Sequence, residues 1–179
     1  YDGTDTATLT GGTLNGVEPG DDVGFTMTGV KAAFSDKNAG TDKSVTVTGA
    51  FKLTGTDAYK YTLIQPPLDL KASITACDQF TDATDQAQTI DVGEDSFEAP
   101  RFTGIGGEPV EGDLVYGLTD GKTEKDIPAM LRGLKAGESL YIPYTFTASG
   151  NYSGKKPGTI TVTAQERPAS SVTPVAPSY

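Results

Sequence analysis

Short alternating segments separated by turn residues run through this chain and limit what it can fold into. Apolar residues occupy every second position in segments such as 23–27, 45–47, 68–74 and 140–146. This spacing buries one face of a strand and leaves the other in water. Gly-Gly, Asn-Gly and Pro-Gly pairs between the segments are typical of turns, and the chain is rich in Thr, which favours strands. The sequence therefore predicts an all-β chain rather than alternating β–α units.

Two of these segments lead to more specific expectations. The alternation at 61–63 predicts a further short strand in the first half of the chain. Segment 140–146, the clearest strand, carries Pro143 on its outward face. Because proline has no N–H to donate to a ladder, we expect this strand to lie at an edge of its sheet or to be bulged.

One segment of the second half breaks the strand rhythm. Its apolar side chains follow the spacing i, i+3, i+4, i+7 of one helical face: Ile127, Met130, Leu131 and Leu134. Thr123 and Asp126 have the spacing of a capping box, Pro128 suits a first helical turn, and Gly137 can terminate the segment. We therefore expect one short helix over about residues 123–135, bridging two strands at the end of a sandwich.

The composition favours two small domains over one large one. Only 36% of the 179 residues are hydrophobic, below the globular share of roughly 45–50%. A thin core suits small domains. We place the domains at 1–76 and 77–166, with a Pro/Ser-rich linker at 167–179.

Charge and residue usage exclude several classes of function. The net charge is −10 and no region is strongly basic, so binding to nucleic acid is not expected. The chain has no His, which removes Ser-His-Asp and Cys-His catalysis, and a single Cys, which removes an internal disulfide. No apolar run reaches the roughly 18–20 residues of a membrane span. Because the chain opens without Met, we expect it to be a fragment of a longer protein.

Four ordered motifs in the first half resemble a known family. They are Tyr1–Thr4, Gly16–Val23, Ala33–Gly40 and Leu53–Leu63. Together they are similar to the YDG repeat, over about residues 1–75. That family occurs in large bacterial surface proteins, often in tandem and beside Ig-like modules, and the resemblance implies no catalytic residue. Lys60 departs from the pattern, in which Asn usually precedes the tyrosine.

The second half resembles another bacterial Ig-like surface module. The similarity lies in Gly150–Gly154 and Gly158–Val162. The two resemblances imply two tandem Ig-like β-sandwich domains, all-β, with the short helix in the second. They also imply a non-catalytic stalk role in an adhesin-like protein at the bacterial cell surface or secreted from the cell. Its expected partners are neighbouring modules of the same longer chain, and no cofactor is expected.

A carbohydrate- or host-ligand-binding module is the alternative. Aromatic rings can stack on sugars, and Tyr59 and Tyr141 are the candidates, since Tyr141 alternates away from the apolar residues beside it. Tyr61 and Tyr152 are better explained as tyrosine-corner-like residues, which bury the ring and bond a nearby backbone carbonyl.

The acidic residues suggest two further sites. Asp78, Asp82 and Asp85 lie together at the domain boundary, with Glu94 and Asp95 nearby, and carboxylates at a hinge could bind calcium. No EF-hand spacing is present, so solvated linker acids are the simpler interpretation. The pairs Asp21-Asp22 and Glu94-Asp95 could serve glycoside hydrolysis. Because neighbouring strand residues point to opposite faces, we interpret these pairs as turn acids and expect no enzyme activity.

Overall fold

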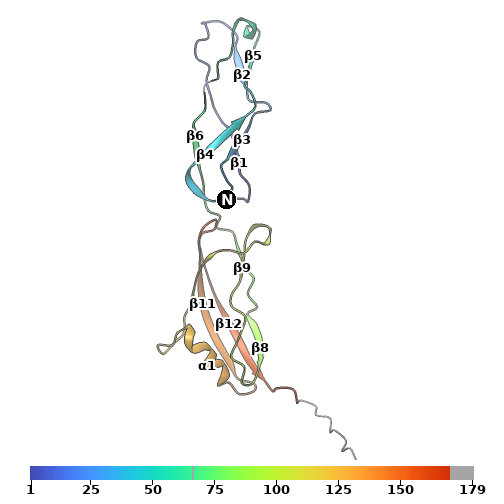
Figure 1. Ribbon diagram of the computed structural model, residues 1–179, viewed down its shortest axis with the longest axis vertical. Coiled ribbons are helices and arrows are strands. Elements are labelled where there is room, and N and C mark those ends of the chain that lie inside the picture. Colours follow the sequence, from blue (N-terminus) through green and yellow to red (C-terminus); the bar gives the residue numbers. More distant parts are fainter. Residues whose placement is uncertain (66, 170–179) are drawn as a thin grey trace, which may run out of the picture. The chain divides into compact units, whose positions relative to one another are not determined.

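The computed structural model describes residues 1–65 and 67–169, and these residues are mostly β-strand (Figure 1). The chain divides into two compact units, which are described separately. Unit 1 comprises Tyr1–Asp78 together with Gly150–Tyr152, and unit 2 comprises Gln79–Ser149 and the chain from Ser153. From residue 170 onward, the predicted linker lies outside the described residues.

Unit 1 is built from short antiparallel strands in two sheets. Four of them form a sheet in the order β1-β3-β4-β6, and the remaining two pair with each other as β2-β5. The strands are β1 (Thr6–Ala7), β2 (Gly24–Thr26), β3 (Lys31–Phe34), β4 (Gly40–Thr48), β5 (Lys52–Thr54) and β6 (Leu70–Ile74). Strands β2, β4 and β6 lie where the alternation at 23–27, 45–47 and 68–74 predicts them, and β5 contains Leu53 of the alternating pair Phe51 and Leu53.

The predicted strand at 61–63 is wrong. Tyr61 follows a 3-10 turn at Ala58–Lys60 and has extended backbone angles, but residues 61–63 pair with no strand of the described chain. The side chains of Tyr61 and Leu63 are nevertheless half-buried. Alternation therefore predicted the burial of these side chains correctly. A strand also needs a neighbouring strand to pair with, and the described chain provides none beside residues 61–63.

Unit 2 has one long sheet and one short one. The long sheet has the order β10-β11-β12-β8, and the short sheet pairs β7 with β9. The bounds are β7 (Thr81–Asp82), β8 (Ala87–Asp91), β9 (Phe102–Thr103), β10 (Gly112–Tyr116), β11 (Ser139–Ala148) and β12 (Lys155–Gln165). Strand β11 is antiparallel to both of its neighbours, β10 and β12, whereas β8 runs parallel to β12.

Strand β11 lies between β10 and β12 and its register to both is continuous, so the prediction that it lies at an edge or is bulged is wrong. The carbonyl of Pro143 accepts a hydrogen bond of 2.8 Å from the N–H of Gly117, just beyond the end of β10. In an antiparallel ladder the N–H and C=O of one residue point to the same side. The missing N–H of Pro143 therefore faces the place where β10 has ended, and no bond to β12 is lost.

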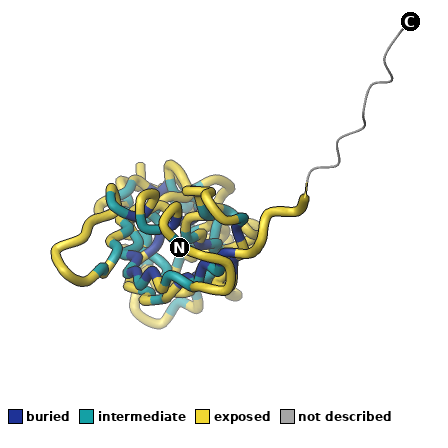
Figure 2. Tube along the Cα trace, turned by 90° about the horizontal axis from the view of Figure 1, so that it is seen from below, coloured by how far each residue is buried: buried dark blue, intermediate teal, exposed yellow. Residues whose placement is uncertain are grey.

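The core of unit 2 lies on one face of the long sheet. Along β11 and β12 the buried residues alternate with less buried ones, as the sequence predicts. The buried set comprises Ile142, Tyr144, Phe146, Ile160, Val162 and Ala164. Figure 2 colours the chain by burial, with buried stretches in dark blue and exposed loops in yellow. Unit 1 has a more open core, because only Ala32 and Val45 are buried among its strand residues.

The short helix of unit 2 confirms the capping prediction. A 3-10 turn at Glu124–Asp126 leads into α1 (Ile127–Arg132), and Asp126 accepts hydrogen bonds from the N–H and hydroxyl of Thr123 at 2.8 and 3.0 Å. The helix stops at Arg132, before the predicted end at 135, because Gly133 is a poor helix residue. The helices that the structure describes are all too short or too polar to cross a lipid bilayer.

Candidate functional site

A polar network joins two loops of unit 1 around Tyr61. The Tyr61 hydroxyl donates to Oδ2 of Asp21 at 2.6 Å and accepts the backbone N–H of Glu18 at 3.0 Å. The hydrogen bond from Tyr61, followed by that from Lys60, lowers the pKa of Asp21. The bond to Asp21 raises the pKa of Tyr61. The predicted partner, a backbone carbonyl, is wrong: this tyrosine holds the loop through a carboxylate and an amide.

Lys60 extends the same network. Its Nζ lies 2.7 Å from Asp57 and 3.0 Å from Asp21, and these bonds raise its pKa. Asp57 in turn accepts the N–H of Asp22, while the Asp22 carboxylate accepts two hydrogen bonds from Thr56, which lower its pKa. Asp21 and Asp22 are thus both held within turns. The sequence signal for this network is Lys60 three residues after Asp57, at the position where Lys60 replaces the Asn of the YDG pattern.

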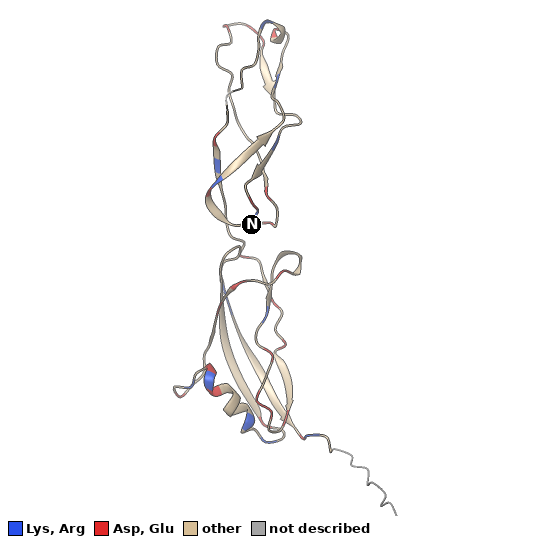
Figure 3. Ribbon diagram, in the orientation of Figure 1, with Lys and Arg blue, Asp and Glu red and all other residues tan. Residues whose placement is uncertain are grey.

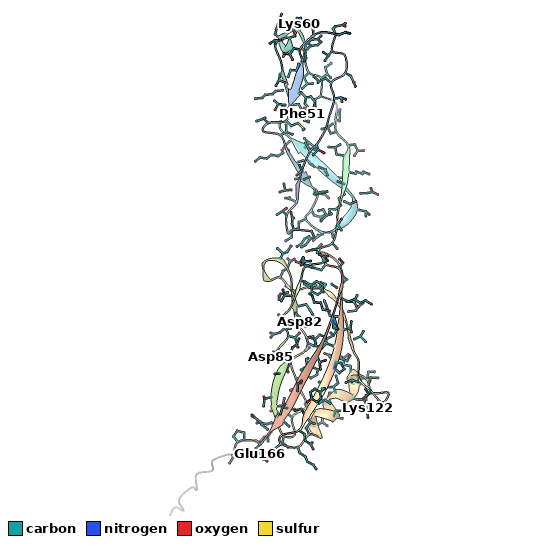
Figure 4. The ribbon with its side chains drawn as sticks, turned by 180° about the vertical axis from the view of Figure 1, so that it is seen from behind. Phe51, Lys60, Asp82, Asp85, Lys122 and Glu166 are labelled. Carbon is teal, nitrogen blue, oxygen red and sulfur yellow. The ribbon has the colours of Figure 1, made fainter. Side chains whose placement is uncertain are left out.

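The three candidate calcium ligands are not brought together as a metal site. Asp82 accepts the Thr84 N–H at 2.9 Å and Asp85 accepts the Ala87 N–H at 3.3 Å, so both carboxylates cap turns beside β7 and β8 (Figure 4). Asp78 is exposed in unit 1. Across residues 1–65 and 67–169, no group of three acidic or cysteine side chains could hold a metal ion. Asp95 instead forms an ion pair with Arg132 of α1.

Asp82 has a second partner that the sequence did not reveal. Its Oδ2 accepts the hydroxyl of the buried Tyr144 at 2.5 Å. Burial acts to raise the pKa of Asp82, but the hydrogen bonds from Thr84, Tyr144 and Gln86 together lower it. Burial, together with the bond to Asp82, raises the pKa of Tyr144. This pair ties β7 to the middle of β11.

The tyrosines differ in exposure as predicted. Tyr59 is 82% exposed and Tyr141 is 66% exposed, while Tyr152 is buried. Tyr59 lies in the 3-10 turn of unit 1, and Tyr141 lies on β11 opposite Thr161 of β12. Both candidate rings are therefore accessible to a ligand.

An apolar-rich cavity lies within unit 1. It has a volume of about 550 Å³, and its lining includes Phe25 of β2, Leu53 of β5 and Leu70 of β6, together with apolar, Thr, Asn, Gln and Gly residues of the neighbouring loops. Phe25 and Phe51 meet edge to face in its wall, with ring centroids 6.0 Å apart. Its described lining holds no acidic, basic, Cys or Ser side chain, and the Tyr61 hydroxyl is bonded to Asp21. The cavity therefore offers space but no acid–base pair for catalysis.

The charged side chains are scattered rather than gathered. Figure 3 shows the acidic residues in red distributed along both units, with small groups of both signs near α1. The acidic groups whose pKa changes all have their pKa lowered by hydrogen bonds. A general acid at neutral pH would need a raised carboxyl pKa. These six carboxylates are instead stabilised as anions by their hydrogen bonds.

The comparisons with known proteins concern the first unit. Residues 1–68 match the family model of the YDG domain. The YDG match is somewhat shorter than the resemblance at about residues 1–75, and it contains the whole Tyr61 network. No curated protein and no solved structure matches the chain. The YDG match does not extend to unit 2, for which an Ig-like identity stays a prediction.

Proposed function

We propose that this chain is a non-catalytic mechanical spacer, two tandem Ig-like β-sandwich modules of a bacterial cell-surface or secreted adhesin-like protein. The YDG match over residues 1–68 supports the first half of this proposal. The partners are neighbouring modules of the same longer chain. The hydrogen-bond network around Tyr61 holds two loops of unit 1 together, which suits a spacer.

The observation that carries the proposal is the pairing of β8 with β12. In chain order these are the first and last strands of the long sheet in unit 2. They are neighbours in the sheet and run parallel over five register pairs. The Thr161 N–H donates to Gln86 at 2.8 Å and the Val92 N–H donates to Gln165 at 2.9 Å, which closes the ladder at both ends.

This arrangement resists tension along the chain. A force on the chain before β8 and after β12 pulls the two strands in opposite directions along their common axis. Because the hydrogen bonds lie across that axis, the ladder is sheared as a unit instead of opening one bond at a time. A spacer under tension benefits from this geometry.

Force spectroscopy on the full chain tests the proposal. One set of molecules is held at both termini, which shears β8 against β12. A second set is held at Lys135→Cys and Arg167→Cys, which flank the open end of the β11–β12 hairpin. Pulling at these two positions separates β11 from β12 one hydrogen bond at a time. Both sets carry Cys77→Ser, because Cys77 is the only native thiol. We expect unit 2 to unfold at clearly higher force in the terminal geometry.

Equal or lower force in the terminal geometry would contradict the spacer proposal. Circular dichroism of the two proteins checks that the substitutions leave the fold intact. Since both geometries unfold the same unit, a difference in force reports the direction of loading and not the overall stability.

A further inference from the structure

The outward face of the long sheet in unit 2 has an unusual composition. Six of its residues define what we call the threonine face: Val115 of β10, Tyr141 and Thr145 of β11, and Thr159, Thr161 and Thr163 of β12. The register places Tyr141 opposite Thr161, Ser139 opposite Thr163, and Val115 opposite Thr145. Figure 1 shows β11, β12 and β8 side by side in this sheet.

The threonine face is open and holds accessible apolar groups. Tyr141 is 66% exposed and Val115 is 65% exposed, although both lie on regular strands of a four-stranded sheet. Pro143 follows Tyr141 on the same face of β11. By register, Pro143 lies between Tyr141 and Thr145, the partner of Val115, so the three side chains form an apolar strip across the face, beside the threonine hydroxyls.

The hydroxyls beside this strip are available. Thr163 is bonded to Ser139 at 2.8 Å, but Thr159 and Thr161 form no side-chain hydrogen bond within the described chain. Along one strand, side chains of the same face repeat every two residues, about 6.7 Å apart. A threonine hydroxyl can both donate and accept a hydrogen bond. The face thus presents regularly spaced donors and acceptors next to an aromatic ring.

Charge decides which partner fits. Between the cross-strand pairs Ser139–Thr163 and Thr145–Pro157, no residue paired in this sheet carries a charge. The charged residues Asp91, Asp113 and Lys155 lie at the ends of the face. The whole chain has a net charge of −10, so an anionic partner would be repelled. A cationic partner would find no carboxylate across the middle of the face.

A protein partner fits less well than a sugar. Protein interfaces depend on aromatic, Met or Arg anchors that are fully removed from water. The threonine face offers one aromatic residue, without Leu, Ile, Phe, Met or Arg. A sugar ring has an apolar C–H face that stacks on an aromatic side chain and a rim of hydroxyls, which matches this surface.

We propose that the threonine face binds a neutral polysaccharide, with Tyr141 stacking on a sugar ring and Thr159 and Thr161 hydrogen-bonding to its hydroxyls. This role does not depend on the spacer function, since binding in solution requires no tension. It assigns to unit 2 a ligand class that the YDG match does not concern.

Affinity gel electrophoresis of the full chain tests the proposal. The probes are mixed-linkage β-glucan, xylan and galactomannan as neutral polymers, and polygalacturonate as an acidic one. We expect retardation by at least one neutral polymer and none by polygalacturonate. Tyr141→Ala should weaken binding about three- to tenfold, and Thr161→Val about two- to tenfold. Tyr141→Phe, which keeps the ring, should bind like the native chain.

Tyr59→Ala is the matched control, because Tyr59 is also an exposed tyrosine but lies in unit 1. Loss of binding on Tyr59→Ala with no effect of Tyr141→Ala would place the site elsewhere and overturn the proposal. Retardation only by polygalacturonate, or by none of the four polymers, would also overturn it. Thermal unfolding of each variant verifies that lost binding is not lost folding.

Discussion

Removing the hydroxyl of Tyr144 should destabilise unit 2 chiefly by breaking its short hydrogen bond to Asp82, since its other hydrogen bond, accepted from Nε2 of Gln86, is long at 3.4 Å. In Tyr144→Phe the ring stays in the core, where Tyr144 is 2% exposed, but Oδ2 of Asp82 loses its 2.5 Å partner. A hydrogen bond to a charged group contributes about 1.5–3 kcal/mol. Because Asp82 is only half-buried, water can reach the freed oxygen. We therefore expect a loss of about 1–2 kcal/mol in the free energy of unfolding.

The loss should be measurable by urea titration and by thermal scans at pH 7. For a unit of this size, about 1 kcal/mol corresponds to roughly 4–8 °C in Tm, so Tyr144→Phe should lower the Tm of unit 2 by about 5–15 °C. Tyr141→Phe removes a hydroxyl from the same strand at a solvent-exposed position and is the control. It should change the free energy of unfolding by less than about 0.5 kcal/mol.

The pH dependence gives an independent check. The pKa of Asp82 is lowered in the folded chain, so its contribution to stability is present above the unfolded pKa of about 3.9 and is lost as the pH falls through the folded pKa. The difference between the native chain and Tyr144→Phe should therefore be largest above about pH 5 and should shrink below about pH 4. A difference that stays constant from pH 7 to pH 3, or an equal loss in Tyr141→Phe, would refute the assignment to the Asp82–Tyr144 bond.

Two further predictions concern the helix of unit 2. Leu131→Ala, at a fully buried position of α1, should lower the free energy of unfolding by about 3 kcal/mol in urea titrations, whereas Val115→Ala at an exposed position should change it little. Asp126→Ala removes the acceptor of the Thr123 N–H and should cost about 1 kcal/mol, while Asp126→Asn, which keeps an acceptor oxygen, should cost less. Equal losses for the two Asp126 variants would contradict the capping role.

Much of the local structure was predictable because its causes lie close together in the sequence. The capping box of Thr123 and Asp126 spans three residues, and the alternation in β11 needs only the side chains of that strand. Strand β3 was missed because its short Lys-Ala-Ala-Phe run has little alternation and Ala is a weak strand former. Its formation depends on pairing with β4.

Among the candidate site residues, exposure could be predicted from the sequence, whereas hydrogen-bond partners could not. The exposure of Tyr141 followed from its place in the alternating pattern, and the structure agrees. The partners of Tyr61 and Tyr144 did not follow, because Asp21 and Asp82 lie 40 and 62 residues away in the chain. A hydroxyl on a strand indicates the need for a partner but does not identify it.

The sequence by itself determined the strand character of the chain, the position of its short helix and which side chains of β11 point outward. Only the tertiary structure decided that β11 is central and that β8 lies parallel to β12. The order of strands in a sheet depends on contacts between residues far apart in the chain, to which no local pattern is sensitive. Those same distant contacts create the threonine face and the parallel pair of β8 and β12, the two features from which the proposed functions follow.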